Sequence, residues 1–524
     1  MRPGPACALW LALAASAAPA RGDDDADRWA AAAVRAASTD PAVRARALED
    51  ARVASDLRAL DVPVRAAAAA KRDRDRAAAQ LATLESDADE AWAARDREVR
   101  AFDRLKDPDA AREDAHRRRL SALRDRTEGL EVAADTTSLE VADREEELDT
   151  ARRVASAVLA RVPPDEVADG VARLRAAWVA DARAEPEDRV RFVEAIERVR
   201  APGVSEALAA LARDARLDAR VRAAALDARA ARRDEGVLDE AVAATADPSW
   251  VVAAAALDVL RTLHEPAAIE PLIAFLRRED LGRLREDAWR ALRSLTGERH
   301  GPYAEPWAAW WAEHARDFEP PRRPASLAEL AAPDSGATFY GITTFSTRIV
   351  FTLDVSGSMA EPLRRGAADG ARRIDSARRE ALGALDFLDE RGRFGVVLFD
   401  RGVRRFAGGL VRADADSRRR AKTWLFEREP RGETNLLDAL REAFRMASGL
   451  DGAAPPLAGA DTVFLLSDGL PTAGGVRSPE RIVESVRRWN RSARLVVHCV
   501  ALGGQDGGLL ADIAAATGGR YVRR

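Results

Sequence analysis

Three short segments in the last third of the chain carry side chains that suit one kind of chemistry. The segment DVSGS at residues 354–358 offers a carboxylate and two hydroxyls at alternating positions, which lets all three converge from one short loop. A threonine at the start of a predicted helix and an aspartate in the segment SDG at 467–469 complete the set. The five side chains are Asp354, Ser356, Ser358, Thr434 and Asp468. Carboxylates and hydroxyls are hard oxygen donors, so the set predicts a site for a small divalent cation such as Mg²⁺.

These segments lie at the ends of the elements of a predicted α/β domain. Apolar strands are predicted at 349–353, 394–399, 462–466, 495–502 and 521–522, with amphipathic helices between them. This alternation indicates a doubly wound, mostly parallel sheet, to which 403–406 would add an antiparallel edge strand. Ligands of such sheets bind beyond the carboxyl ends of the strands, where Asp354 and Asp468 are expected.

The charge of the candidate site indicates what it would attract. Only two of its five donors are carboxylates, so a bound divalent cation would keep a net positive charge. We therefore expect the site to accept a further anionic oxygen from outside the domain.

The order D-x-S-x-S, then Thr, then Asp resembles the metal-ion-dependent adhesion site of von Willebrand factor A-type domains, including integrin inserted domains. The resemblance covers about 340–524 and implies a Rossmann-like fold that binds Mg²⁺ or Mn²⁺. It also implies that Ser356 and Ser358 are direct ligands, and that Thr434 binds directly or through water. Asp354 and Asp468 would act largely through water and hydrogen bonds. The alternative is that the acidic and hydroxyl side chains only satisfy loop backbone groups, as in relatives that have lost the metal.

The part of the chain before this domain is predicted to be entirely helical. Residues 23–60 suggest two helices, with Asp40 as a cap and Pro41 as the first residue of the second. Heptad-like apolar spacing within 64–162 predicts two long helices, interrupted near Pro108. An antiparallel hairpin is the simplest arrangement, and an intermolecular coiled coil is the alternative.

A repeat follows the predicted hairpin. Similar helices recur with anchors at Ile196, Leu226, Leu257 and Leu292, at intervals of 30, 31 and 35 residues. A two-helix unit of this length buries its apolar face only by stacking on its neighbours, which predicts an α-solenoid. The units resemble HEAT-like repeats over about 187–318, and a helix with three tryptophans at 307–311 is expected to cap them.

The N-terminus has the pattern of a secretory signal peptide. Residues 3–20 are uncharged, apolar at 8–13, and end in two A-x-A cleavage sites. An uncleaved anchor is the alternative. Cleavage would leave Cys499 as the only cysteine and no intramolecular disulfide, and the near-absence of lysine is typical of a GC-rich, bacterial genome. The predicted organisation is a signal peptide at 1–20, a helical region at 23–162, HEAT-like repeats at 163–318, a linker at 319–340 and the A-type domain at 341–524.

Several classes of function are disfavoured. No lysine follows a glycine, which excludes a Walker-type nucleotide site, and a formal net charge of -4 gives no footprint for nucleic acid or an anionic membrane. The five histidines lack metal-ligand spacing, and His498 is expected in the core. A metal-dependent hydrolase would need a general base that the motif does not supply.

The sequence therefore predicts an exported, non-enzymatic scaffold of the periplasm or cell envelope, without stable membrane insertion once the signal is cleaved. The whole arrangement looks like bacterial exported proteins that join HEAT-like repeats to this domain, including the segment FYGI at 339–342. The expected partner is a protein whose Asp or Glu carboxylate completes the metal coordination. The alternative is a subunit of an envelope assembly that couples to a separate ATPase or secretion machine.

Overall fold

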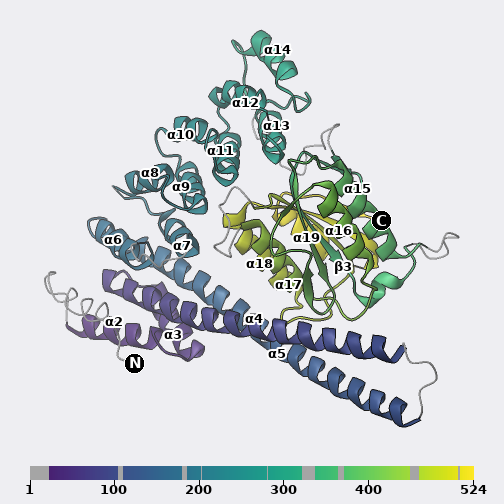
Figure 1. Ribbon diagram of the computed structural model, residues 1–524. Helices are drawn as coiled ribbons and strands as arrows, with labels where there is room; N and C mark the ends of the chain where they lie inside the picture. The colour runs from purple at the N-terminus through teal and green to yellow at the C-terminus, as the bar shows by residue number, and fades with distance from the viewer. Residues whose placement is uncertain are drawn as a thin grey trace.

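A helical N-terminal part leads into an α/β domain in the computed structural model of this chain (Figure 1). The structure describes residues 23–103, 110–179, 186–201, 203–279, 281–321, 337–363, 371–448, 459–505 and 508–524. The predicted signal peptide at 1–20 and the predicted interruption at Pro108 lie outside these residues. Within the described ranges, no helix is both long enough and apolar enough to cross a membrane.

Two short helices open the described chain, as predicted. They are α2 (Asp23–Ala36) and α3 (Pro41–Arg52), followed by the 3-10 turn η1 (Leu57–Leu60). Asp40 caps α3, because its side chain accepts a hydrogen bond from the backbone N–H of Ala42. The guanidinium of Arg44 is fully buried and forms ion pairs with Asp73 and Glu147, which fixes α3 to the two long helices that follow.

The two long helices, α4 (Asp61–Asp103) and α5 (Ala110–Leu159), pack side by side as an antiparallel hairpin within one chain (Figure 1). Their predicted apolar seam is buried at Leu81, Ala91, Leu148 and Ala151. Near-absence of glycine and proline lets the helices run this long, while the seam holds them together.

Stacked helices form the next part of the chain. They are α6 (Val167–Trp178), α7 (Pro186–Ile196), α8 (Val204–Arg213), α9 (Ala219–Arg232), α10 (Val237–Ala244), α11 (Trp250–Leu263), η2 (Pro266–Ala268), α12 (Ile269–Leu276), α13 (Arg283–Thr296) and α14 (Ala304–His314). The four predicted anchors lie on α7, α9, α11 and α13, and all four are buried. In α14, Trp307 is fully buried and donates from Nε1 to the carbonyl of Gly301 at 2.8 Å, whereas Trp310 and Trp311 are half-buried.

The α/β domain is built on a seven-stranded sheet with the order β5-β4-β3-β7-β8-β9, in which β6 also pairs with β4. The strands are β3 (Arg348–Asp354), β4 (Arg393–Phe399), β5 (Val403–Arg405), β6 (Val411–Arg412), β7 (Thr462–Gly469), β8 (Val496–Gln505) and β9 (Tyr521–Arg523). All pairs among β3, β4, β7, β8 and β9 are parallel, whereas β5 and β6 are antiparallel to β4. The predicted sheet and its antiparallel edge are therefore confirmed.

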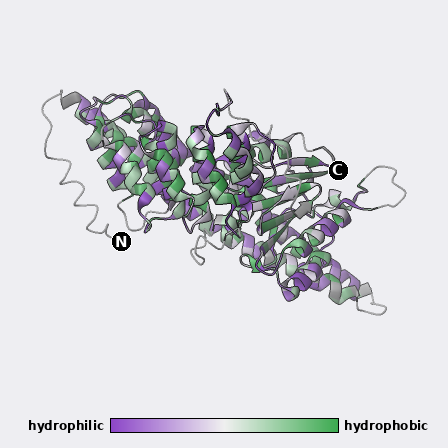
Figure 2. Ribbon diagram, turned by 90° about the horizontal axis from the view of Figure 1, so that it is seen from above, coloured by the Kyte–Doolittle hydropathy of each residue, from purple (hydrophilic) through white to green (hydrophobic). Residues whose placement is uncertain are grey.

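Helices cover both faces of this sheet. They are α15 (Arg373–Phe387), α16 (Ala415–Phe426), α17 (Leu436–Ser448), α18 (Pro479–Ala493) and α19 (Leu509–Ala516). One core joins α15 and α16 to one face, and a second core joins α17, α18 and α19 to the other. Figure 2 shows the resulting contrast between apolar strands and helices with mixed faces.

The α/β unit begins earlier than the predicted boundary at 341. Residues placed in the linker form the strand β1 (Ala337–Phe339), which pairs with β2 (Ile342–Thr344). Phe339 is buried, with its ring 4.6 Å from that of Phe464, so the end of the predicted linker belongs to the core of the sheet.

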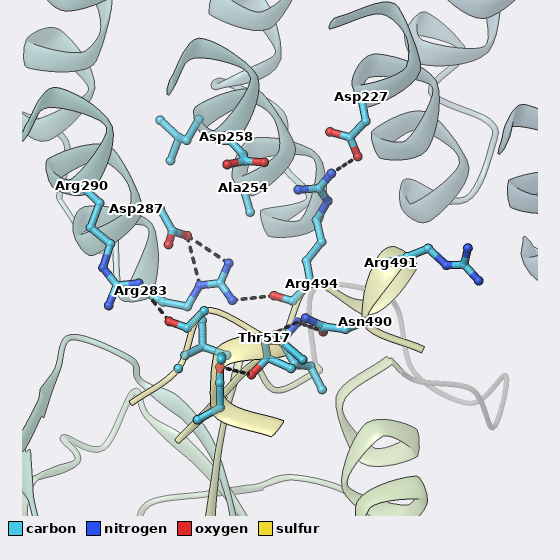
Figure 3. A pocket seen from close by; sticks show the side chains of 18 of the residues that line it. Asp227, Ala254, Asp258, Arg283, Asp287, Arg290, Asn490, Arg491, Arg494 and Thr517 are labelled. Carbon is cyan, nitrogen blue, oxygen red and sulfur yellow. Dashed lines mark hydrogen bonds and ion pairs between the residues drawn. The ribbon is translucent and has the colours of Figure 1, made fainter. Parts of the chain in front are cut away.

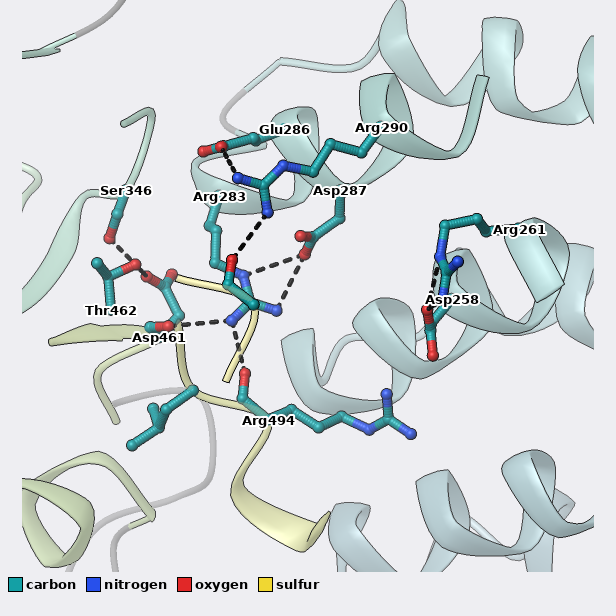
Figure 4. Close-up of polar contacts among 12 residues, drawn as sticks. Asp258, Arg261, Arg283, Glu286, Asp287, Arg290, Ser346, Asp461, Thr462 and Arg494 are labelled. Carbon is teal, nitrogen blue, oxygen red and sulfur yellow. Dashed lines mark hydrogen bonds and ion pairs between the residues drawn. The ribbon is translucent and has the colours of Figure 1, made fainter. Parts of the chain in front are cut away.

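The stacked helices meet the sheet at the amino ends of its strands (Figure 4). Arg283 of α13 donates to the carbonyls of Asp461 at 3.0 Å and Arg494 at 2.6 Å. Asp461 directly precedes β7, and Arg494 lies two residues before β8. Beside this contact lies a cavity of about 1140 Å³, with Asp227 and Asp258 on the helical side and Thr517 on the other (Figure 3). The carboxyl ends of the strands, where the candidate metal ligands lie, form the opposite edge of the sheet.

Candidate metal centre

The first of the candidate ligands, Asp354, is the last residue of β3 and is fully buried. Its Oδ1 accepts a hydrogen bond from the backbone N–H of Ser356 at 2.8 Å, and its Oδ2 accepts one from the hydroxyl of Ser467 at 2.6 Å. The next turn is the 3-10 helix η3 (Gly357–Ala360). The carboxylate is thus held rigidly at the base of the segment that carries both serines.

Direct contacts then join the other members of this group. The hydroxyl of Ser358 donates to Oδ1 of Asp468 at 2.8 Å and lies 3.2 Å from the hydroxyl oxygen of Ser356. Ser356 and Asp468 are buried, but Ser358 is exposed, so the group opens to solvent on one side. The structure therefore brings together four of the five side chains at the carboxyl ends of β3 and β7.

Thr434 is placed beside this group by main-chain hydrogen bonds. The backbone N–H of Gly357 donates to the carbonyl of Gly432 at 3.0 Å, and that of Arg431 donates to the carbonyl of Val355 at 2.8 Å. These bonds tie the loop at 431–435 to the serine segment. Among the described residues, none forms a hydrogen bond with the Thr434 hydroxyl, so this oxygen is available as a ligand.

A third loop, 468–476, holds Thr434 from the other side. The Thr434 N–H donates to the Thr472 hydroxyl at 2.9 Å, and the N–H groups of Thr472 and Ala473 both donate to the Thr434 carbonyl, at 3.0 and 3.1 Å. The backbone of Thr434 is therefore fixed by the segment that follows Asp468.

The residues present fit a small divalent cation. Asp354 is a buried carboxylate that forms no ion pair with any described Lys or Arg side chain, and burial raises its pKa to about 7. A charge buried among hydroxyl and amide donors is stabilised when a cation joins the site. Within the described part of the chain, no three His, Cys, Asp or Glu side chains form an alternative metal cluster.

Sequence reasoning missed a cation that already touches this group. Arg373, at the start of α15, donates from Nη1 to Oδ2 of Asp468 at 2.6 Å and pairs through Nη2 with Glu361 at 3.0 Å. Gly503 leaves the space for it, because a Cβ at this position would lie 2.7 Å from Nε of Arg373. Arginine is so abundant in this chain that no pattern distinguishes Arg373. Sequence reasoning also missed Ser467 as the hydroxyl donor to Asp354, although its position directly before Asp468 was a signal that could have identified it.

Comparison with known families agrees with this fold. Residues 347–523 match the family described as von Willebrand factor type A domain. This part of the chain is a von Willebrand factor A-type domain. The helix-rich part that precedes it lies outside the match. Domains of this type typically mediate protein–protein interactions.

Similar proteins align with this A-type domain. The inter-alpha-trypsin inhibitor heavy chain H4 of Homo sapiens is 29% identical over 164 residues, which is 31% of this chain and 16% of that protein. The heavy chain H3 of Mesocricetus auratus is 30% identical over 149 residues, 28% of this chain and 16% of that protein. The chain thus matches about a sixth of the length of these relatives.

Among solved structures, the von Willebrand factor type A protein from Catenulispora acidiphila is 25% identical, with a TM-score of 0.28 over 34% of this chain and 38% of that one. A point mutant of the PilB minor pilin from Streptococcus sanguinis is 15% identical, with a TM-score of 0.25 over 34% of this chain and 56% of that one.

Proposed function

We propose that this protein is an exported scaffold whose A-type domain binds a protein partner through a divalent metal, Mg²⁺ or Mn²⁺. The observation that carries the proposal is the convergence of three loops, with the Ser358 hydroxyl 2.8 Å from Asp468 and 3.2 Å from the Ser356 hydroxyl. When bound there, the cation supplies a positive centre that accepts a carboxylate oxygen of the partner.

Each residue has a defined part in this proposal. Ser356, Ser358 and Thr434 offer hydroxyl oxygens to the cation. Asp468 orients the Ser358 hydroxyl, Asp354 holds the backbone of Ser356, and both carboxylates balance the charge. Leu470, 42% exposed just beyond Asp468, offers the partner an apolar contact at the rim. The proposed role is binding and not catalysis, since Asp354 and Asp468 are both engaged in holding the hydroxyl donors.

A spectroscopic experiment tests the metal site without a known partner. Mn²⁺ bound with an open coordination position enhances the relaxation of water protons, because the bound water exchanges with the solvent. We expect enhancement with the wild-type protein, its loss with Ser356→Ala, and its reduction when acetate is titrated in as a stand-in for the partner's carboxylate. No enhancement with the wild-type protein would contradict the proposal.

A capture experiment tests the partner. Immobilised protein is incubated with an envelope extract in Mg²⁺ or in EDTA, and Asp354→Ala protein is treated in the same way. We expect proteins that are retained only by the wild-type chain in Mg²⁺. A retained set that EDTA and Asp354→Ala leave unchanged would show that capture does not use the metal.

The proposed export rests on the pattern at residues 1–20. A fusion of this segment to a reporter enzyme that is active only outside the cytoplasm should give activity. Replacing the apolar residues at 8–13 with charged ones should abolish it.

A further inference from the structure

We propose that the helical hairpin positions the loops of the metal site, so that its affinity for Mg²⁺ depends on the docking of α4 and α5. This inference rests on the proposed function and adds a means of regulation to it. Figure 1 shows the hairpin running along the A-type domain past α17 and α18. Four separate contacts connect it to the loops at 431–435 and 468–476.

The first contact is an ionic bridge through Arg401, which follows β4. Nε of Arg401 lies 2.9 Å from a carboxylate oxygen of Glu131 on α5, and Nη2 donates to Asp135 at 3.4 Å. Nη1 of the same guanidinium bonds to Glu433, the residue directly before Thr434. One side chain thus links two carboxylates of the hairpin to the loop that carries a proposed metal ligand.

The second contact is a pair of glycines wedged between the hairpin and the same loop. A Cβ on Gly474, which has a φ of +92°, would lie 2.3 Å from Oδ1 of Asn435. A Cβ on Gly475 would lie 2.1 Å from the carbonyl oxygen of Asp135 on α5. The loop that hydrogen-bonds to Thr434 is therefore in backbone contact with α5 on one side and with the neighbour of Thr434 on the other.

The third contact is a buried chain of hydrogen bonds. The hydroxyl of Ser138 on α5 donates to Oδ1 of Asp438 at 2.9 Å, and Oδ2 of Asp438 accepts from Nδ2 of Asn435 at 2.7 Å. Asn435 in turn donates to the carbonyl of Arg401 at 3.1 Å. The residue that follows Thr434 is thus held by a network anchored in the hairpin.

The fourth contact comes from α4. The guanidinium of Arg431 stacks over the ring of Trp92, 4.4 Å from its centroid, and the indole N–H of Trp92 donates to Glu131 at 2.8 Å. Since the N–H of Arg431 also bonds to Val355 of the serine segment, this contact reaches a second loop of the site.

Together these contacts fix the backbone on both sides of Thr434. The Thr434 hydroxyl is the ligand that depends most on them, because main-chain hydrogen bonds join its loop to the serine segment. Removing the hairpin's carboxylates should let the loop relax, and the separation of Thr434 from the serines should then vary. The expected effect is a weaker metal site in a folded protein.

The test uses the full chain and Mg²⁺ alone, with affinity measured by isothermal titration calorimetry. In the hairpin variant, Glu131→Gln is combined with Asp135→Asn, which removes the two charges of α5 that face Arg401 and leaves Glu433 in place. A matched control combines Glu145→Gln with Asp149→Asn, which removes two charges from the same helix. Those residues contact the far end of α18, where Glu145 accepts from Trp489 at 3.1 Å and Asp149 pairs with Arg491 at 3.0 Å.

We expect Mg²⁺ to bind the hairpin variant about five-fold more weakly or worse, the lower end of coupling between distinct sites. The control should keep the wild-type affinity. Equal affinity in all three proteins, or an equal loss in both variants, would overturn the coupling while leaving the metal proposal intact. If the wild-type chain itself binds no Mg²⁺, the proposed function fails and this inference fails with it.

Thermodynamic linkage between hairpin docking and metal binding gives a second test. Its result would not change with Mg²⁺ if the hairpin had only a structural role. If hairpin docking strengthens metal binding, metal binding must strengthen docking by the same factor. Hydrogen exchange at residues 131–139 should therefore slow when Mg²⁺ is added to the wild-type protein, and not when it is added to Ser356→Ala protein. Exchange that ignores Mg²⁺ in the wild-type protein would contradict the coupling.

Discussion

The buried carboxylate of Asp354 accepts hydrogen bonds from the backbone N–H of Ser356 and from the hydroxyl of Ser467. Ser467 donates to it at 2.6 Å, and both side chains are buried. We expect Ser467→Ala to lower the free energy of unfolding by about 1–3 kcal/mol, because one oxygen of the buried carboxyl group loses its hydroxyl donor. Urea denaturation measures this loss. Ser467→Thr keeps the hydroxyl and should retain most of the stability, so an equal loss in both variants would point to packing and not to the hydrogen bond.

His498 provides a pH dependence of stability. Burial in β8 lowers its pKa well below 6.5, with further lowering by Arg290 and other nearby arginines. Below about pH 6.5, His498 is therefore protonated in the unfolded chain but stays neutral in the native state. The free energy of unfolding then falls as the pH falls, by at most about 1.4 kcal/mol per pH unit.

Replacing His498 should remove this dependence. The His498 Nδ1 accepts a hydrogen bond from the N–H of Arg520 at 3.0 Å, and Asn offers an oxygen in a similar place. We expect the free energy of unfolding of His498→Asn protein to change less between pH 7 and pH 5 than that of wild type, by about 1–2 kcal/mol. Denaturant titrations at both pH values measure the difference. If the stability of the wild-type and His498→Asn proteins changed equally with pH, His498 would not be the source of the pH dependence.

At the same scale, the sequence predicted the members of the candidate site but not what surrounds them. The alternation in DVSGS and the strand ends are local features, so Asp354, Ser356 and Ser358 could be found from their spacing. Arg373 could not, because its contact with Asp468 arises only when α15 packs beside the end of β7.

Among the elements, the contact of the loop at 468–476 with α5 leaves no room for a side chain. Gly475→Ala would place a methyl group 2.1 Å from the carbonyl oxygen of Asp135, so one of the two backbones must move. We expect a loss of about 1–3 kcal/mol in the free energy of unfolding and faster hydrogen exchange at residues 131–139. Gly408→Ala is the matched control, since a Cβ at Gly408 meets no atom within 4 Å. If Gly475→Ala and Gly408→Ala had the same stability and the same exchange rates, the close approach of Gly475 to the Asp135 carbonyl would be contradicted.

Helices and strands were predicted well where periodicity alone decides them. The predicted helix start at Pro41 coincides with the first residue of α3, and the predicted strand at 394–399 falls within β4. The linker was placed wrongly at its end because β1 is only three residues long, too short for an alternating pattern, and owes its place to the burial of Phe339 among other rings.

Across the whole molecule, Arg283 joins the stacked helices to the sheet. Its guanidinium donates to two carbonyls of the A-type domain and pairs with Asp287 at 3.0 Å. We expect Arg283→Ala to cost about 1–3 kcal/mol, because it leaves the carbonyls of Asp461 and Arg494 without this donor. Scanning calorimetry should show a lower transition temperature, and Arg283→Lys should lose less. A transition unchanged in Arg283→Ala would show that this contact contributes nothing to the joint.

The arrangement of the parts could not be predicted from the sequence. The hairpin and the A-type domain are separated by all the stacked helices, and the contacts between them involve residues about 300 positions apart, such as Ser138 and Asp438. Charged side chains are spread along the whole chain, so those that meet across this interface carry no distinguishing local signal.

The length of α5 has a mechanical consequence. From its contacts at residues 131–149 the helix continues back to Ala110, which at about 1.5 Å per residue is an arm of roughly 30 Å. The fulcrum of this lever is the patch that touches the loops around Thr434. A load applied near Ala110 would act as a torque at that patch, so a force on a distant part of the protein would reach the proposed metal site.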